Sequence, residues 1–198
     1  MPVNGLHLLF FIVGSTVLTG CATVDLPESS PGHVEHLDRP EPLRGAPGDV
    51  VALILMSTDC PVANAMAPQI RRDIESLEGR GVRCYLVYPR PGTTAEQMAA
   101  HAASYRLDAR QVPDPDHRIV TALDGTITPQ AYVLSFESDD AWLIRYSGRV
   151  NDLYASIGNR RDLVTERSWH DAAIATLDGA PMEIRSFPAV GCMIERRR

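Results

Sequence analysis

One cysteine in the sequence stands where a thiol can become reactive. Cys60 follows an apolar run and directly precedes Pro61. Proline is favoured at the first position of a helix, so Cys60 is expected at a helix N-terminus, where unpaired N–H groups and the helix dipole favour an anion. The thiolate is the nucleophilic form of cysteine. Ser57 and Thr58 add hydroxyl donors, whereas the Asp59 carboxylate would oppose ionisation if it pointed inward.

A second cysteine could complete a redox pair. Cys192 follows a short Pro- and Gly-containing segment, which suits a tail that folds back onto the domain. Such a thiol could resolve a sulfenic acid or a mixed disulfide on Cys60, provided that the two Cα atoms come within about 7 Å. The alternative is a free or structural tail cysteine. Cys84 lies in an apolar run and is expected to behave as a small buried hydrophobe.

The fourth cysteine belongs to an export signal. The apolar run Leu8–Val13 is too short to span a bilayer and is typical of a signal peptide. It leads to Leu-Thr-Gly-Cys21, which resembles the bacterial lipobox, so Cys21 is expected to be lipidated and to become the new N-terminus. Residues 1–6 contain no Lys or Arg, which leaves an ordinary cleaved signal or an uncleaved anchor as alternatives. Each of these readings places the domain outside the cytoplasm, facing the periplasm or the cell exterior.

Length and composition set the remaining limits. The 198 residues are 44% hydrophobic with a net charge of -6, which does not favour nucleic acid as a partner. We expect a signal peptide (1–20), a Pro-rich tether (21–48), one domain (49–181) and a C-terminal tail (182–198) that carries Cys192. The tether has too few apolar residues to offset its ordering entropy.

The domain reads as alternating strands and helices. Strands are expected at 49–56, 82–88, 131–136 and 141–147, with helices at 61–79, 94–105, 116–123 and from 168 onward. This order predicts an α/β sandwich with a mixed four- to five-stranded sheet and helices on both faces.

Several finer expectations follow from local patterns. Alternation places Trp142, Ile144 and Tyr146 on one face of their strand, and Ser168 is expected to cap the last helix, with Asp171 completing an approximate capping box. The histidines at 101, 117 and 170 fall on polar faces and are expected to be solvated.

The placement of Cys60-Pro61, Pro68 and Thr128-Pro129 resembles the thioredoxin-like superfamily. More narrowly, the segments STDCPVANAMAP, TPQAYVLS, YSGRVNDLY and AVGCMIE resemble exported redoxin-domain proteins of the peroxiredoxin and thiol-oxidoreductase group. The resemblance implies a cis peptide at Thr128–Pro129 facing Cys60. It also implies that Thr128 and Pro129 offer backbone groups to an extended thiol substrate.

The sequence departs from the family pattern at several positions. Ala63 stands where a thioredoxin has its second cysteine, and Leu53 stands where a peroxiredoxin has its proline. Gln130 occupies the place of the peroxiredoxin arginine, for which Arg145 or Arg149 could substitute.

The expected function is an extracytoplasmic thiol oxidoreductase that reduces peroxides or disulfides. Cys60 is the expected nucleophile and Cys192 the resolving thiol, with Ser57, Thr58, Thr128 and Pro129 as substrate-binding residues. No cofactor or metal is expected. The expected partners are the thiol, disulfide or peroxide substrate, an electron donor, and a membrane through the lipid anchor. The alternatives are a copper-delivery protein, which would need Cys60 and Cys192 together, and a thioredoxin-like binding module without chemistry.

The lipobox leads to a testable prediction. The mature protein should begin at Cys21 and partition into detergent, and Cys21→Ser should abolish lipidation and yield a soluble product or an unprocessed precursor. Mass spectrometry of the N-terminus tests this, because an unmodified N-terminus at Ala22 or later in the wild-type protein contradicts it.

Overall fold

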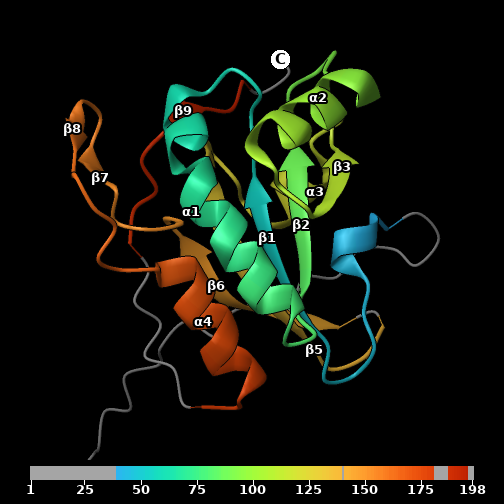
Figure 1. Cartoon of the computed structure of the whole chain (residues 1–198). Helices are drawn as coiled ribbons and strands as arrows, with labels where there is room; N and C mark the ends of the chain where they lie inside the picture. Colours follow the sequence, from blue (N-terminus) through green and yellow to red (C-terminus); the bar gives the residue numbers. More distant parts are fainter. Residues whose placement is uncertain (1–38, 140, 181–186, 196–198) are drawn as a thin grey trace, which may run out of the picture.

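The described part of the chain folds around one mixed sheet. The computed structural model describes residues 39–139, 141–180 and 187–195, and within them a five-stranded sheet carries helices on both faces (Figure 1). The expected signal peptide, Cys21 and tether residues 22–38 lie outside the described residues. Among the described helices, none is long and apolar enough to cross a bilayer.

The elements alternate as the sequence predicts, with additional short strands. The strands are β1 (Val50–Leu55), β2 (Arg83–Tyr88), β3 (Arg110–Pro113), β4 (Ile127–Thr128), β5 (Gln130–Phe136), β6 (Trp142–Gly148), β7 (Tyr154–Ser156), β8 (Asn159–Arg160) and β9 (Cys192–Met193). The helices are α1 (Pro61–Glu78), α2 (Ala95–Tyr105), α3 (Arg118–Ala122) and α4 (Ser168–Leu177), and a 3-10 turn, η1 (Glu41–Leu43), precedes β1.

β1 is the central strand of the sheet, whose order is β3-β2-β1-β5-β6. It runs parallel to β2 and antiparallel to β5, and all six of its residues are buried. A strand covered on both faces must be apolar throughout, which explains the unbroken Val50–Leu55 run. The mixed five-stranded sheet confirms the predicted fold class.

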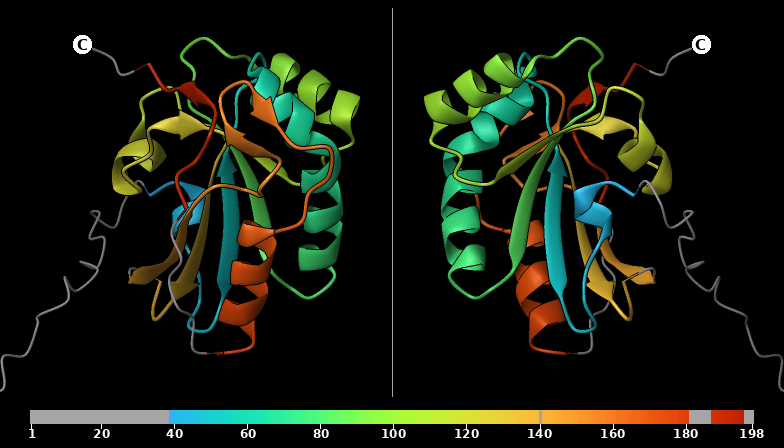
Figure 2. Two further views of the ribbon diagram at one scale, coloured as in Figure 1. Left: turned by 90° about the vertical axis from the view of Figure 1, so that its left-hand side faces the viewer. Right: turned by 90° about the vertical axis from the view of Figure 1, so that its right-hand side faces the viewer.

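The two faces of the sheet have separate hydrophobic clusters. Ala52 and Ile54 point into the cluster under α1, α2 and α4, whereas Leu53 and Leu55 point into the one under α3 and η1. Figure 2 shows these two sets of helices on opposite sides of the strands. Burying a Val, Leu or Ile side chain contributes about 1.5–3 kcal/mol, so the sheet is stabilised from both sides.

α1 and α2 begin as their sequences predict. Pro61 is the first residue of α1, directly after the N-cap Cys60. The helix continues through Pro68, which lies on its exposed side. At α2, the hydroxyl of Thr94 accepts from the Gln97 N–H and the Gln97 side chain accepts from the Thr94 N–H, a complete capping box.

The prediction that Tyr146 shares a face with Trp142 and Ile144 was wrong. Val133 pairs with Tyr146 while the next residue of β5 pairs with Ile144, so β6 contains one extra residue, a β-bulge. The bulge reverses the alternation. Tyr146 therefore packs in the cluster under α1, α2 and α4, whereas Trp142 and Ile144 pack in the cluster under α3 and η1.

The predicted cap of the last helix was also wrong. α4 begins at Ser168 with Arg167 as its N-cap residue, and no side chain caps it. The Ser168 hydroxyl instead accepts a hydrogen bond from Arg149 Nε (3.2 Å), and the Asp171 carboxylate pairs with His170.

The three histidines expected in solvent are buried. His101 contacts the Tyr88 hydroxyl, His117 contacts the Pro89 carbonyl oxygen, and His170 contacts the Ser76 hydroxyl, each at about 3 Å. Their polar groups are satisfied by partners far along the chain, which a helical pattern does not reveal.

The boundary expected at residue 48 lies too far along the chain. Leu43 is 1% exposed and belongs to the cluster under α3 and η1, so the segment 39–48 packs on the domain. Arg39 Nη1 donates to the carbonyl oxygen of Asp139, at the turn between β5 and β6 (2.8 Å).

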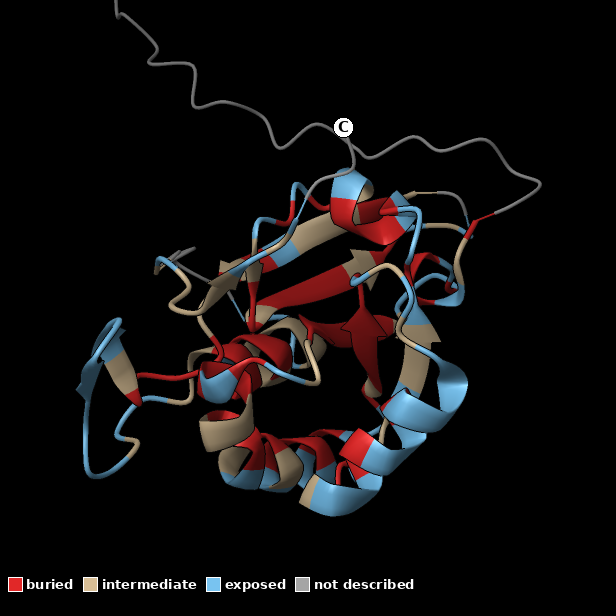
Figure 3. Cartoon of the chain, turned by 90° about the horizontal axis from the view of Figure 1, so that it is seen from above, coloured by how far each residue is buried: buried red, intermediate tan, exposed pale blue. Residues whose placement is uncertain are grey.

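Figure 3 shows a contrasting segment, the hairpin β7–β8, which extends from the body with mostly exposed residues.

Leu43 tests whether the segment before β1 belongs to the folded unit. Leu43→Ala should lower the free energy of unfolding by about 2–5 kcal/mol, because it leaves a cavity in the core. Leu163→Ala makes the same change at a side chain that is 75% exposed. This control variant should change the free energy of unfolding by no more than about 0.5 kcal/mol. Urea unfolding measures both, and equal effects would show that Leu43 does not contribute to the core.

Candidate functional site

Cys60 lies at the end of the sheet where β1 finishes. A short loop, Ser57–Asp59, joins β1 to α1 and leaves Cys60 as the N-cap residue of the helix. The residue is 1% exposed, and its thiol donates to the Thr128 carbonyl oxygen (3.1 Å). The Cys60 side chain makes no capping hydrogen bond to the helix N–H groups. The helix end thus contributes its dipole, and the direct contacts of the sulfur come from other segments.

Thr128 and Pro129 face Cys60 as the resemblance implies. The peptide bond between them is cis, and both residues are buried. Thr128 belongs to β4, whose backbone pairs antiparallel with β9. The predicted cis peptide next to the Cys60 sulfur is confirmed by the geometry.

β9 brings the second thiol into contact with the first. Cys192 is the residue paired with Thr128, and its Sγ lies 2.8 Å from Cys60 Sγ. Both cysteines are free thiols in this structure. The contact joins residues 132 positions apart, and it is the geometry from which a disulfide can form by a small approach of the sulfurs.

The ionisation of Cys192 is suppressed. Burial, a hydrogen bond with Cys60 and the charge of Cys60 raise the pKa of Cys192 to about 11. Cys192 therefore keeps its proton at neutral pH and can donate it to the Cys60 sulfur. Burial raises the pKa of Cys84 well above its usual range, consistent with an inert thiol in β2.

The loop before Cys60 is held by polar contacts. The Ser57 hydroxyl donates to Asp59 Oδ1 (2.5 Å), and the Asp59 carboxylate also pairs with Arg90. The hydrogen bond from Ser57 and the pairing with Arg90 lower the pKa of Asp59, and the charge of Asp59 in turn helps to raise the pKa of Cys192. The Thr58 carbonyl accepts from Asn64 Nδ2 (3.2 Å).

A cavity of about 180 Å³ opens beside the two sulfurs. Its lining includes Ser57, Asp59, Cys60, Arg90, Thr128 and Cys192. Thr58 lines neighbouring depressions instead of this one. The cavity therefore combines both thiols, the guanidinium of Arg90 and two carboxylates, those of Asp59 and Glu195.

Sequence reasoning missed Arg90 and the support behind the loop. Arg90 follows β2 between two prolines, and no local pattern marks it as a site residue. Behind Thr58, Asn64 Oδ1 contacts His101 Nε2 (2.9 Å), and His101 Nδ1 contacts the Tyr88 hydroxyl (2.9 Å). This relay fixes the loop that carries Cys60.

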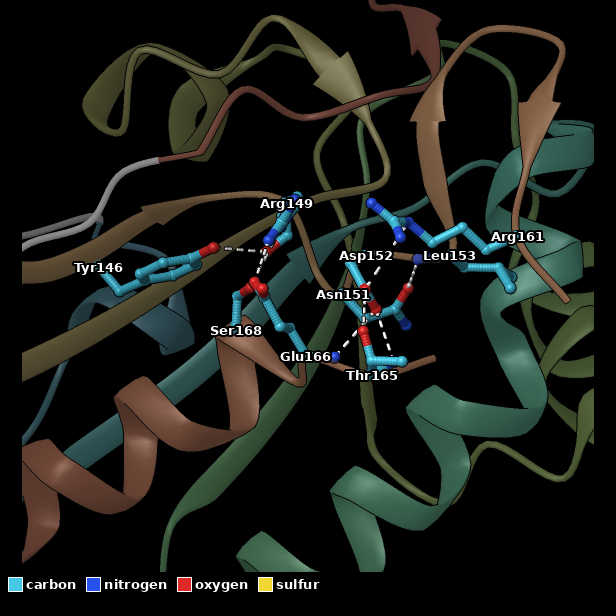
Figure 4. A network of polar contacts seen from close by, with 9 residues as sticks. All are labelled: Tyr146, Arg149, Asn151, Asp152, Leu153, Arg161, Thr165, Glu166 and Ser168. Carbon is cyan, nitrogen blue, oxygen red and sulfur yellow. Dashed lines mark hydrogen bonds and ion pairs between the residues drawn. The ribbon is translucent and has the colours of Figure 1, made fainter. Parts of the chain in front are cut away.

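The two arginines considered as substitutes are engaged elsewhere. Arg145 Nε donates to the Ser135 hydroxyl on the sheet. Figure 4 shows Arg149 bonded to Ser168 and Glu166, in the polar network between β6 and α4. Gln130, at the family's arginine position, accepts through Oε1 from the N–H groups of Thr126 and Ile127 and so orders the chain before β4.

The described residues hold no group of three or more His, Cys, Asp or Glu that could bind a metal ion. The copper alternative requires Cys60 and Cys192 together, and their sulfurs do lie in contact.

A Ser–His–Asp contact lies away from the cavity. The His170 ring contacts the Ser76 hydroxyl (3.0 Å) and the Asp171 carboxylate (2.9 Å). Ser76 lies inside α1, where backbone N–H groups bond within the helix and cannot stabilise an oxyanion. The contact joins α1 to α4.

No protein-family model matches the sequence, and no curated protein matches it. Solved structures do match. The chain is similar to an uncharacterized conserved protein from Geobacillus kaustophilus, with a TM-score of 0.65 and 21% identity over 76% of this chain and 78% of that chain. A hypothetical protein from Sinorhizobium meliloti has a TM-score of 0.63 and 19% identity, over 74% and 79%. A secreted Mycobacterium tuberculosis disulfide oxidoreductase homologous to E. coli DsbE has a TM-score of 0.43 and 15% identity, over 67% and 83%.

The described elements form a thioredoxin-like fold. A central β1 leads into a helix headed by Cys60, and a cis-proline before β5 faces that cysteine across the end of the sheet. The predicted fold class is confirmed, and the narrower resemblance to exported redoxin-domain proteins stays a prediction.

The sulfur contact predicts one disulfide. Stoichiometric oxidant should join Cys60 to Cys192, and mass spectrometry of the digested protein should find this bond while Cys84 stays reduced. Cys192→Ser should leave Cys60 as a sulfenic acid or mixed disulfide, whereas Cys84→Ala should leave the bond unchanged. A disulfide between Cys192 and Cys84 would be incompatible with this geometry.

Proposed function

We propose that this protein is an extracytoplasmic thiol oxidoreductase in which Cys60 is the nucleophile and Cys192 the resolving thiol. The observation that carries the proposal is the 2.8 Å contact between the two sulfurs at the head of α1. A second thiol within bonding reach can release the adduct on a nucleophilic cysteine inside the protein, and Cys192 is held within that reach by backbone pairing.

The first step is attack by the Cys60 thiolate. With a hydroperoxide, the sulfur bonds to the terminal oxygen, the O–O bond breaks, and the alkoxide leaves as an alcohol after it takes a proton. With a disulfide, the sulfur bonds to one substrate sulfur and the other leaves as a thiolate. Cys60 is oxidised in each case, to a sulfenic acid or a mixed disulfide.

The second step is resolution by Cys192. Its sulfur attacks Cys60 Sγ, its proton goes to the leaving group, and water or a thiol is released with formation of the Cys60–Cys192 disulfide. Two electrons and two protons from an external dithiol donor restore both thiols. The raised pKa of Cys192 supports this order, because a protonated Cys192 donates to Cys60 in the resting state.

Two residues bear on whether the substrate is a peroxide or a disulfide, a choice that parallel assays with both substrates test. Arg90 lines the cavity with Cys60 and supplies a cation that could polarise a bound oxidant, which supports the peroxide branch. Gln130 at the usual arginine position weighs against it, since its oxygen already accepts two backbone N–H groups.

The extracytoplasmic part of the proposal is supported by the sequence at the N-terminus. The apolar run Leu8–Val13 is typical of a signal peptide, and Leu-Thr-Gly-Cys21 resembles a lipobox, which together support export and lipid attachment. A lipid anchor would place the domain at a membrane surface.

Variants at the three cysteines of the domain test the proposal. Cys60→Ser should abolish turnover of both hydrogen peroxide and a model disulfide, and Cys192→Ser should permit one turnover and then stall. Cys84→Ala should retain wild-type turnover, because Cys84 lies buried away from the cavity. Steady-state assays with a dithiol donor measure all three, and wild-type turnover by Cys60→Ser would refute the proposal.

A further inference from the structure

The edge of β4 beside Cys60 is occupied by the chain's own C-terminal segment. Ile127 pairs with Met193, Thr128 pairs with Cys192, and the N–H of Ile194 donates to the Thr126 carbonyl oxygen (2.9 Å). An open strand edge is where an extended peptide adds to a protein by backbone pairing. Here that edge is already paired.

Gly191 makes this docking possible. A Cβ atom at residue 191 would overlap the Thr128 carbonyl oxygen and would also lie 3.0 Å from Ile127 Cγ2. The same carbonyl accepts the Cys60 thiol. Any side chain at 191 would therefore push β9 away from the peptide group that contacts the nucleophile.

The segment is also attached at its other end. The Arg149 N–H donates to the Phe187 carbonyl oxygen (3.0 Å), and the Arg149 guanidinium lies 4.0 Å above the Phe187 ring centre. Arg149 itself is fixed by Ser168 and Glu166 in the network of Figure 4. The segment 187–195 is thus held on both sides of Gly191.

We propose that this docked segment makes Cys60 selective for small two-electron oxidants, such as a hydroperoxide or a low-molecular-weight disulfide, and excludes extended polypeptide disulfides. The inference rests on the proposed function and names its substrate class. A small molecule can enter the cavity of about 180 Å³ without displacing a strand. A polypeptide must displace β9 to pair with β4.

Displacement of β9 also removes the resolving thiol. A polypeptide disulfide that reached Cys60 would form a mixed disulfide and release one thiolate, but Cys192 would no longer be in contact to break that bond. A small disulfide leaves β9 in place, so Cys192 attacks Cys60 Sγ and releases the second thiolate. Selectivity and resolution therefore depend on the same pairing.

The test compares three oxidants on the reduced protein: hydrogen peroxide, bis(2-hydroxyethyl) disulfide, and an unstructured peptide that contains a disulfide. The small disulfide should consume the Cys60 thiol on the order of a hundredfold faster than the peptide, which reacts only with the fraction of molecules whose edge is open. The comparison of hydrogen peroxide with bis(2-hydroxyethyl) disulfide shows which kind of small oxidant, a peroxide or a disulfide, consumes the Cys60 thiol faster.

Gly191→Ala should raise the rate at which the peptide consumes the Cys60 thiol by about tenfold, because the fraction of molecules with β9 detached from β4 increases. The mixed disulfide between the peptide and Cys60 should accumulate. Gly158→Ala adds the same methyl group at the β7–β8 turn, where it meets no neighbour but strains a backbone with a φ of +79°. That strain lies outside the residues that line the cavity, so this variant should keep the wild-type ratio. Equal wild-type rates for peptide and small disulfide, or an unchanged ratio in Gly191→Ala, would overturn the inference.

Hydrogen exchange provides a second readout that needs no variant. The Ile194 amide should be protected in the reduced protein and remain so during reaction with the small disulfide, whereas free exchange in the reduced protein would show an open edge and refute the inference. If none of the three oxidants forms the disulfide, the proposed function itself fails. If all three form it at similar rates, only the selectivity fails.

Discussion

The peptide group of Thr128 is the fixed point of the site. Its carbonyl oxygen accepts a hydrogen bond from the Cys60 thiol, and its backbone pairs with Cys192. The next residue leads into β5, which pairs with β1, the strand that precedes Cys60. Two sulfurs far apart in sequence meet because both are positioned against one backbone segment. Backbone pairing sets distances within tenths of an ångström, so the contact does not depend on long side chains.

The same chemical group behaves differently at three places in the domain. Cys84 is enclosed by the core, where burial raises the pKa of its thiol. Cys192 is partly exposed, and burial together with the contact to Cys60 raises its pKa. Cys60 is buried, yet it borders a cavity and a second thiol. Reactivity in this fold is therefore determined by what lies next to the sulfur, more than by its exposure.

Local patterns predicted what local forces determine. The apolar run of β1, Pro61 at the start of α1 and the Thr94 cap each depend on neighbours within a few residues. β3 was not predicted because its four residues are only partly buried. The β4–β9 pairing joins two-residue strands that are 64 positions apart at Thr128 and Cys192, and a two-residue strand has no periodicity to detect. The bulge in β6 likewise depends on the partner strand.

The segment before β1 and the Cys60 thiol lie at opposite ends of the sheet. Arg39 is bonded to the β5–β6 turn, at the end of the sheet where β1 begins, whereas Cys60 follows the end where β1 finishes. A six-residue strand separates these ends, a span of about 20 Å. The residues that precede Arg39 therefore join the domain at the end of the sheet that is remote from the two thiols. If Cys21 is lipidated as the sequence predicts, the anchored segment joins the described domain at Arg39, at the end of the sheet remote from the cysteine pair.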